Sequence, residues 1–180
     1  MVQLEELDAD APPPEEIPGA SLSSRVCDGL WLASELALEE DGGGGACLVD
    51  RGVTHVVAFG SAPPGASTGA FAGVHAYERA ENGALVTHMR EAIGFVDAAI
   101  SGGGQVAFYS EEEGEAGAAF LLASYLVLAR ANSPEDATEA VMRARPLCGL
   151  KTHEEFPKNL RFLGRNGIPV SYTHLTLPTN

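Results

Sequence analysis

Apolar positions along the chain change their spacing several times, and each spacing predicts a different element. Short runs of β-branched and apolar residues predict strands at 30–32, 53–59, 74–77 and 106–109. From Thr87 to Gly102 the apolar residues recur every three to four positions, which predicts a helix with one buried face. Residues 118–130 are apolar nearly all round, which predicts a helix enclosed within the domain.

Capping signals predict where the remaining helices begin and end. Ser133 can accept hydrogen bonds from the free N–H groups of a first turn, and the proline and two acids after it suit that turn. Thr152 opens a Thr-His-Glu-Glu segment, which predicts a second cap and a last helix with apolar residues at 156, 160 and 163. Shorter helices are expected at 34–40 and 46–51, the second of them closed by Gly52.

The order of these elements is strand, helix, strand, strand, helix, strand and then three helices. Such alternation favours an α/β fold with a largely parallel sheet flanked by helices, expected over 24–165. Residues 1–23 are expected to form a disordered tail, since the first twenty positions carry six acids, four prolines and no base. Residues 170–180 resemble the conceptual translation of a sequencing adapter, which leaves open whether the native sequence continues beyond Pro169.

Charge and cysteine content narrow the classes of function. The net charge is −14, so nucleic acid and anionic membranes are poor partners, whereas a protein partner, in particular a basic one, fits. No apolar run approaches the length of a membrane-spanning helix, and the acidic start lacks the order of a signal peptide. Cys27, Cys47 and Cys148 are widely spaced, which indicates free thiols. These features predict a cytoplasmic or nuclear protein without a cofactor or bound metal.

Six short segments occur in a family-like order along the chain. They are 25–34 (RVCDGLWLAS), 52–57 (GVTHVV), 103–109 (GGQVAFY), 123–126 (ASYL), 132–146 (NSPEDATEAVMRARP) and 155–160 (EFPKNL). Together they resemble the dual-specificity protein phosphatases, which belong to the cysteine-dependent protein tyrosine phosphatase superfamily. The resemblance implies that family's fold, with a mostly parallel central sheet between helices.

The resemblance also implies a defined chemistry. A cysteine thiolate attacks phosphorus, and the loop after it presents backbone N–H groups to the phosphate at the start of a helix. An arginine six residues beyond the cysteine binds the phosphate oxygens, and an aspartate on another loop protonates the leaving oxygen.

Two registers place these catalytic positions on the sequence. Counting forward from the preceding strand gives Ser110 the cysteine position and Ala116 the arginine position. Counting back from the following helix gives the two positions to Glu111 and Gly117, with Gly114 as the central glycine. Both registers stay open, and neither contains a cysteine or an arginine.

Acidic residues are the other unusual feature of the expected site. Glu78 and Glu81 are the candidates for the proton donor, because no aspartate stands there. The glutamates at 111–113 and 115 oppose a dianion, since unit charges about 7 Å apart at a dielectric near 20 interact by roughly 2 kcal/mol. The favourable helix dipole contributes about 0.3–1 kcal/mol. Phosphate binding is therefore expected to be lost. Three interpretations of the run 111–115 stay open: a solvated loop, a contact for a basic protein and a divalent-cation site.

The sequence thus predicts a dual-specificity (tyrosine/serine/threonine) phosphatase-like domain without catalytic activity, acting as an interaction or scaffold module in phosphosignalling. The alternative is an active protein phosphatase with a misread or atypical catalytic loop. Ser110 as a nucleophile would need an adjacent activating base, and no histidine flanks it, so a structural serine is favoured.

Overall fold

Ten elements make up the part of the chain that the computed structural model describes, which is residues 23–34, 37–38, 45–63, 69–77, 84–110 and 114–167. In chain order they are β1 (Ser23–Cys27), β2 (Leu30–Ala33), α1 (Ala46–Val49), β3 (His55–Phe59), β4 (Gly73–Tyr77), α2 (Ala84–Ser101), β5 (Val106–Ser110), α3 (Gly114–Ala129), α4 (Pro134–Ala144) and α5 (Phe156–Asn166). The helix predicted at 34–40 lies mostly outside the described residues. The terminal segment expected at 170–180 lies outside them entirely, and so does the tail expected at 1–23 except for Ser23, which begins β1.

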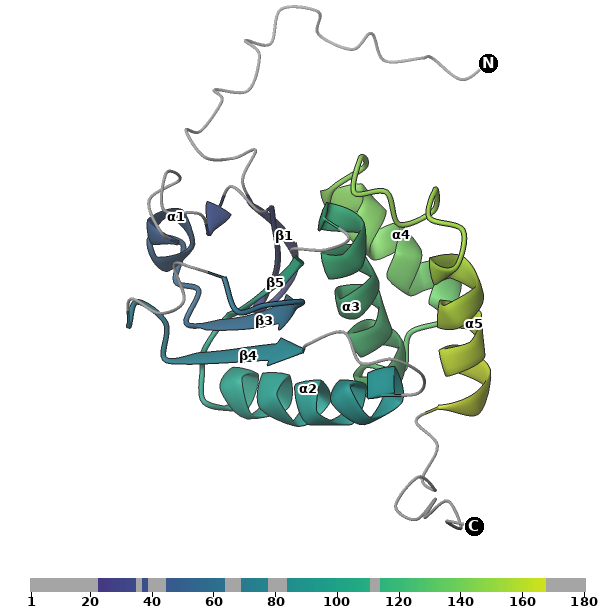
Figure 1. The fold of residues 1–180 in the computed structure, drawn as a ribbon, viewed down its shortest axis with the longest axis horizontal. Coiled ribbons are helices and arrows are strands. Elements are labelled where there is room, and N and C mark those ends of the chain that lie inside the picture. The colour runs from purple at the N-terminus through teal and green to yellow at the C-terminus, as the bar shows by residue number, and fades with distance from the viewer. Residues whose placement is uncertain are drawn as a thin grey trace, which may run out of the picture.

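The strands form one sheet in the order β1-β2-β5-β3-β4 (Figure 1). β5 runs parallel to both of its neighbours, β2 and β3, and β3 runs parallel to β4. β1 pairs with β2 in the antiparallel sense. The predicted largely parallel sheet is confirmed, but β1 was missed because its SSRVC sequence has no apolar run and its pairing depends on β2.

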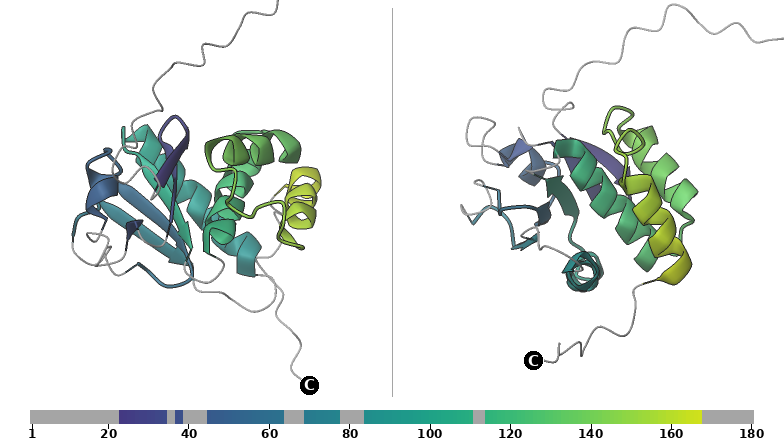
Figure 2. Two further views of the ribbon diagram at one scale, coloured as in Figure 1. Left: turned by 90° about the horizontal axis from the view of Figure 1, so that it is seen from above. Right: turned by 45° about the vertical axis from the view of Figure 1, so that its right-hand side comes forward.

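Helices cover the two faces of the sheet unequally (Figure 2). α2 and α3 pack on one face, where they bury Leu32, Val57 and Phe108. The short helix α1 lies on the other face, where Val56 and Ala107 belong to a smaller core. Side chains alternate along a strand, so each central strand contributes to both cores.

α3 lies at the centre of the larger core. It contacts β5 and β2 on one side and both α4 and α5 on the other. The residues from Ala118 to Val127 are all buried, which confirms that this apolar segment is enclosed by the domain. A helix with neighbours on every side has no solvated face, and its sequence therefore needs no polar stripe.

Two of the predicted helix ends are confirmed. The Ser133 hydroxyl oxygen accepts a hydrogen bond from the Asp136 N–H at 3.0 Å, and Pro134 occupies the first turn of α4. After α1, Gly52 has a φ of +82°, and its N–H donates to the Val49 carbonyl oxygen at 2.8 Å. The left-handed conformation at this position favours glycine.

The predicted cap at Thr152 is wrong. α5 begins at Phe156 and is preceded by Glu155, whose side chain makes no capping hydrogen bond. The Thr152 hydroxyl instead donates to the carbonyl oxygen of Gly149 at 3.0 Å. Serine and threonine side chains bond readily to nearby backbone, and here the turn before the helix takes the hydroxyl that the sequence pattern assigned to the helix itself.

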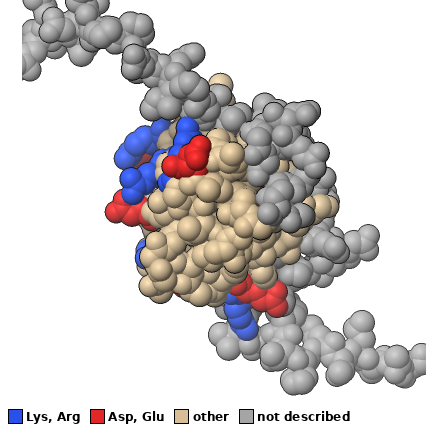
Figure 3. Space-filling model, turned by 90° about the vertical axis from the view of Figure 1, so that its left-hand side faces the viewer, with Lys and Arg blue, Asp and Glu red and all other residues tan. Residues whose placement is uncertain are grey.

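The charged side chains are spread unevenly over the surface. On the face that Figure 3 shows, the described surface is mostly uncharged, and its charged groups lie near the edges, with acidic and basic side chains close together. Among the described residues there is no helix long and apolar enough to cross a membrane.

Candidate functional site

The predicted catalytic positions fall where β5 ends and α3 begins. β5 ends at Ser110, which pairs with Phe59 at the end of β3. Because side chains alternate, Ser110 shares the sheet face of Val106 and Phe108, which is the face that α3 covers. Ser110 is 1% exposed. Its hydroxyl is therefore enclosed by the protein, which suits a structural serine better than a nucleophile that must reach a substrate.

The start of α3 holds the other candidate positions. α3 begins at Gly114 and has Ala116 and Gly117 in its first turn. The free N–H groups of this turn carry the positive end of the helix dipole. Glu111 and its two neighbours at 112 and 113 lie outside the described residues, so the choice between the two registers stays a prediction.

The first turn of α3 packs closely on the connection between α4 and α5. Gly149 in that connection has a φ of +77°, and a β-carbon added to it would lie 3.2 Å from the β-carbon of Ala116. Only glycine combines this backbone conformation with so close an approach. The arginine position of one register therefore faces the neighbouring backbone.

Glu115 and Arg145 form an ion pair across this junction. Arg145 Nε donates to Glu115 Oε2 at 2.7 Å, and Arg145 Nη2 donates to Glu115 Oε1. The side chains are 14% exposed for Arg145 and 29% exposed for Glu115. Arg145 Nη1 also reaches the Ser24 hydroxyl at 3.5 Å. The two-point geometry and the low exposure make this pair stronger than a typical surface ion pair.

The ion pair changes the expected electrostatics of the site. The sequence suggested four glutamates without cationic partners near the start of α3. Glu115 differs from that expectation because its carboxylate forms an ion pair with Arg145. The same contact occupies one edge, Nε and Nη2, of the guanidinium that lies against this helix end. A phosphate at this end would have to compete with a carboxylate of the chain itself for that arginine.

The three cysteines of the chain do not supply a replacement nucleophile. Cys27 lies on β1, Cys47 in α1 and Cys148 in the α4–α5 connection. Burial raises the pKa of all three thiols above the ordinary value, and Glu115 further raises the pKa of Cys148. A thiol needs a lowered pKa to be an effective nucleophile at neutral pH, so none of the three is activated.

The remaining candidates are not brought into the described site. Glu78 and Glu81, the candidates for the proton donor, lie outside the described residues. In the part of the chain that is described, no three side chains of histidine, cysteine, aspartate or glutamate gather in a group that could hold a metal ion.

Behind the first turns, α3 is held by a polar contact with α2. The Tyr125 hydroxyl donates to Asp97 Oδ1 at 2.7 Å, and the Arg130 guanidinium lies 5.6 Å from the Tyr125 ring centroid. Burial and the bond to Asp97 raise the pKa of Tyr125 to about 12. The hydroxyl therefore stays protonated as a donor, and this contact fixes the part of α3 that follows the candidate site.

Comparisons with known proteins place this fold. No protein-family model matches the chain, and neither does any curated protein sequence. Among solved structures, human DUSP28 is 24% identical with a TM-score of 0.58, over 84% of this chain and 97% of that chain. A mouse putative dual specificity phosphatase complexed with zinc tungstate is 22% identical, with a TM-score of 0.58 over 88% and 96%. The human tyrosine phosphatase-like serine/threonine/tyrosine-interacting protein is 15% identical, with a TM-score of 0.61 over 79% and 95%.

These likenesses define the class of fold. The chain has the dual-specificity phosphatase fold, with a central five-stranded sheet between helices, as the six sequence segments implied. The order of strands and helices extends over nearly the full length of the matched structures. At these identities the likeness establishes the fold, and the chemistry has to be argued from the residues of the site.

Arg145 is the site residue that the sequence pattern did not assign. It lies thirty positions after Glu115, at the C-terminal cap of α4, within segment 132–146. Its place in segment 132–146, which carries part of the resemblance, could have drawn attention to it, but nothing in the sequence pairs it with the first turn of α3. That contact depends on how α4 packs on α3.

Proposed function

We propose that this chain is a dual-specificity phosphatase-like domain that no longer hydrolyses phosphoesters and acts as a protein-interaction module in phosphosignalling. One observation carries the proposal. At the end of β5 a buried serine precedes a helix whose first turn contains Glu115, bonded to Arg145, and no cysteine or arginine stands at either candidate register.

The size of the chemical loss supports an inactive domain. Removal of the covalent nucleophile lowers kcat by on the order of 10⁶ in well-studied hydrolases. General acid catalysis adds typically 10²–10⁴-fold. The pKa of each cysteine thiol is raised, so none of the three cysteines replaces the missing covalent nucleophile.

An interaction role is consistent with a neighbour in structure and with the charge of the chain. One similar solved structure carries the name tyrosine phosphatase-like serine/threonine/tyrosine-interacting protein. The present chain has a net charge of −14, which suits a basic protein partner and disfavours nucleic acid and anionic membranes. We place this partnership in the cytoplasm or the nucleus.

Hydrolysis of p-nitrophenyl phosphate by the purified chain, with reductant present, tests the proposal. The expected rate equals that of a solution without protein. A rate that rises in proportion to the concentration of the natural chain, and that is absent in Ser110→Ala, would instead establish an active phosphatase with an atypical loop.

Two repaired variants resolve the register in the same assay. Ser110→Cys with Ala116→Arg restores the pair in one register, and Glu111→Cys with Gly117→Arg restores it in the other. Each needs a control that carries only the arginine, since the nucleophile must account for any gain. Turnover in one repaired double variant and in neither control would support a fold that kept its scaffold while losing its chemistry.

A further inference from the structure

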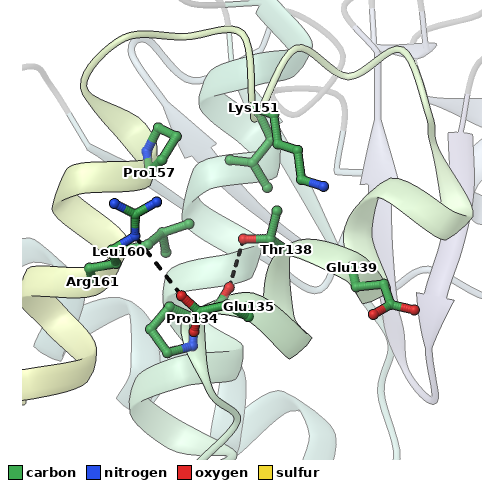
Figure 4. Close-up of a pocket in the computed structure, with 9 residues that line it drawn as sticks. Pro134, Glu135, Thr138, Glu139, Lys151, Pro157, Leu160 and Arg161 are labelled. Atoms are coloured by element: carbon green, nitrogen blue, oxygen red, sulfur yellow. Dashed lines mark hydrogen bonds and ion pairs between the residues drawn. The ribbon is translucent and has the colours of Figure 1, made fainter.

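A pocket between α4 and α5 combines an apolar floor with charged walls (Figure 4). Its volume is about 520 Å³. Leu150 and Leu160 form its floor and are almost fully buried. Pro134 and Pro157 border it at the starts of the two helices. A pocket of this size accepts one or two side chains of an extended segment.

The cations at the pocket are only partly matched by its carboxylates. Figure 4 shows Lys151 on the α4–α5 connection and Arg161 on α5 at two sides of the pocket, with Glu135 and Glu139 on α4. Glu139 is bonded outside the pocket by Arg143 at 2.7 Å, whereas Arg161 reaches Glu135 only at 3.9 Å. The lining thus holds two cations and two carboxylates, and one of the carboxylates already has a partner outside the pocket.

Lys151 is the side chain at the pocket with an uncommitted charge. It is exposed and makes no ion pair with any residue in the described part of the chain. Cations nearer the N-terminus are engaged elsewhere: Arg25 bonds Asp28 at 2.8 Å, and Arg51 donates to the Ser23 carbonyl oxygen at 3.1 Å. The pocket therefore offers positive charge that those arginines do not.

We propose that the acidic N-terminal segment, residues 1–20, docks in this pocket of its own chain. The segment carries six carboxylates and no basic residue, together with prolines and the apolar residues Leu4, Leu7 and Ile17. Carboxylates meet Lys151 and Arg161, while a proline or an apolar side chain lies on the leucine floor. The docked segment covers the face of α4 and α5 and competes with any acidic partner for it.

The stretch between the acidic segment and β1 is long enough to run past α4, and it joins the domain beside that helix. β1 begins at Ser23 and contacts α4, which contacts α5 on its other side. Glu16 lies seven positions before Ser23, a stretch that spans up to about 25 Å. α4 has 11 residues, so its length is about 16 Å. Even the acid closest to the domain is thus joined to β1 by a stretch longer than α4, and a tethered segment docks at a high effective concentration.

Zero-length carbodiimide cross-linking of the full chain tests this docking, because Lys151 and Lys158 are the only two lysines in the sequence. The reagent joins an amine to a carboxylate in contact with it. The expected product joins Lys151 to an acid between residues 5 and 16, identified by mass spectrometry of peptides. Lys158 lies 3.1 Å from a Glu155 carboxylate oxygen, and the link between them reports that the reaction worked.

Two variants separate docking from chance contact. Arg161→Glu reverses a charge at the pocket and is expected to lower the Lys151 link severalfold, while the link at Lys158 is retained. Arg165→Glu makes the same charge change one turn later on α5, outside the pocket lining, and is expected to leave both links unchanged. Equal losses in both variants would show general charge attraction and overturn the proposal.

A mixture of unlabelled and ¹⁵N-labelled chains shows whether the docked segment belongs to the same molecule. Docking within one chain gives cross-linked peptides of a single label type. Mixed-label peptides would assign the pocket to a second copy and contradict the proposal. Linkage of Lys151 only to Glu135, Glu139 or another acidic segment, beside a normal link at Lys158, would contradict it as well. None of these outcomes depends on phosphatase activity.

Discussion

The first turn of α3 and the remainder of the same helix have very different relations to the phosphatase fold. From Ala118 onward, α3 is enclosed by the sheet, α2, α4 and α5, and its buried residues support the core that the fold requires. In the first turn, by contrast, Glu115 holds Arg145, and the preceding strand ends in a buried serine. One helix thus supplies the packing of the phosphatase fold along most of its length, and the proposed loss of phosphatase chemistry concerns only its start.

This difference teaches that the fold and the reaction have separate requirements. Packing of the core requires apolar residues of suitable volume, which many sequences provide. Phosphoester cleavage requires particular groups at particular positions, and the loss of a single group lowers its rate by orders of magnitude. The bidentate pair between Glu115 and Arg145 shows that the altered end is also bonded into the domain.

The largest expected effect is in the enclosed part of the helix. Leu122 is fully buried, and Leu122→Ala should lower the free energy of unfolding by about 2–5 kcal/mol, since it leaves a cavity in the core. Leu147 is 92% exposed and provides the control, because Leu147→Ala should change stability by less than about 0.5 kcal/mol. Urea unfolding measures both. Equal effects would show that α3 is not the centre of the core.

The ion pair at the start of α3 should give the next largest effect. Arg145→Met leaves a mostly buried Glu115 carboxylate without its partner and should cost about 1–3 kcal/mol, between the values for exposed and fully buried pairs. Adding Glu115→Gln should recover part of that loss. Comparison of the two single variants with the double variant gives the coupling energy between Glu115 and Arg145.

Arg143 gives the matched control for this cycle. Its pair with Glu139 is exposed, so Arg143→Met should cost at most about 0.5 kcal/mol. A coupling energy for Glu115 and Arg145 no larger than that of the exposed pair would mean that the altered helix end is not bonded into the domain.

Much of the scaffold could be predicted from the sequence, whereas little of the site could. The strand at 106–109 and the helix at 118–130 were found because their apolar patterns are local, and the structure extends them to Ser110 and back to Gly114. β1 was missed because its pairing with β2 decides its conformation. The bond between Glu115 and Arg145 was missed for a similar reason, since thirty positions separate its partners and helix packing alone brings them together.

Loss of a helix cap should have a smaller effect on stability. Comparing Ser133 with Thr152 also tests the cap that the sequence predicted wrongly. Ser133→Ala removes the acceptor that caps α4 and should cost about 1 kcal/mol. Thr152→Ala should cost less than about 0.5 kcal/mol, because Thr152 bonds a turn and does not cap α5. Thermal unfolding of the two variants provides the measurement. A larger loss at Thr152 than at Ser133 would restore the cap that the sequence predicted.

An effect of similar size to that of the Ser133 cap is expected at the contact that holds α3 to α2. Tyr125→Phe removes the hydrogen bond to Asp97 and should cost about 0.5–1.5 kcal/mol at neutral pH. The pKa of Tyr125 is raised from about 10 to about 12, so the folded state keeps the proton longer than the unfolded state. The contribution of this tyrosine is complete below pH 10 and is lost as the pH rises towards 12.

Absorbance titration of the tyrosines measures this directly. The natural chain should show one tyrosine that ionises near pH 12, and Tyr125→Phe should lack it. Ionisation of all four tyrosines near pH 10 would mean that the contact with Asp97 does not form.

The most direct test of the difference between the two parts of α3 is the binding of a phosphate-like dianion to the natural chain. Sodium tungstate can be titrated while the melting temperature is followed, since a ligand at one hundred times its Kd stabilises a protein by about 2.7 kcal/mol. A chain whose Arg145 is held by Glu115 should show no saturable rise in melting temperature at millimolar tungstate. A saturable rise that disappears in Arg145→Met would show that the start of α3 still receives a phosphate, which contradicts the loss of the site.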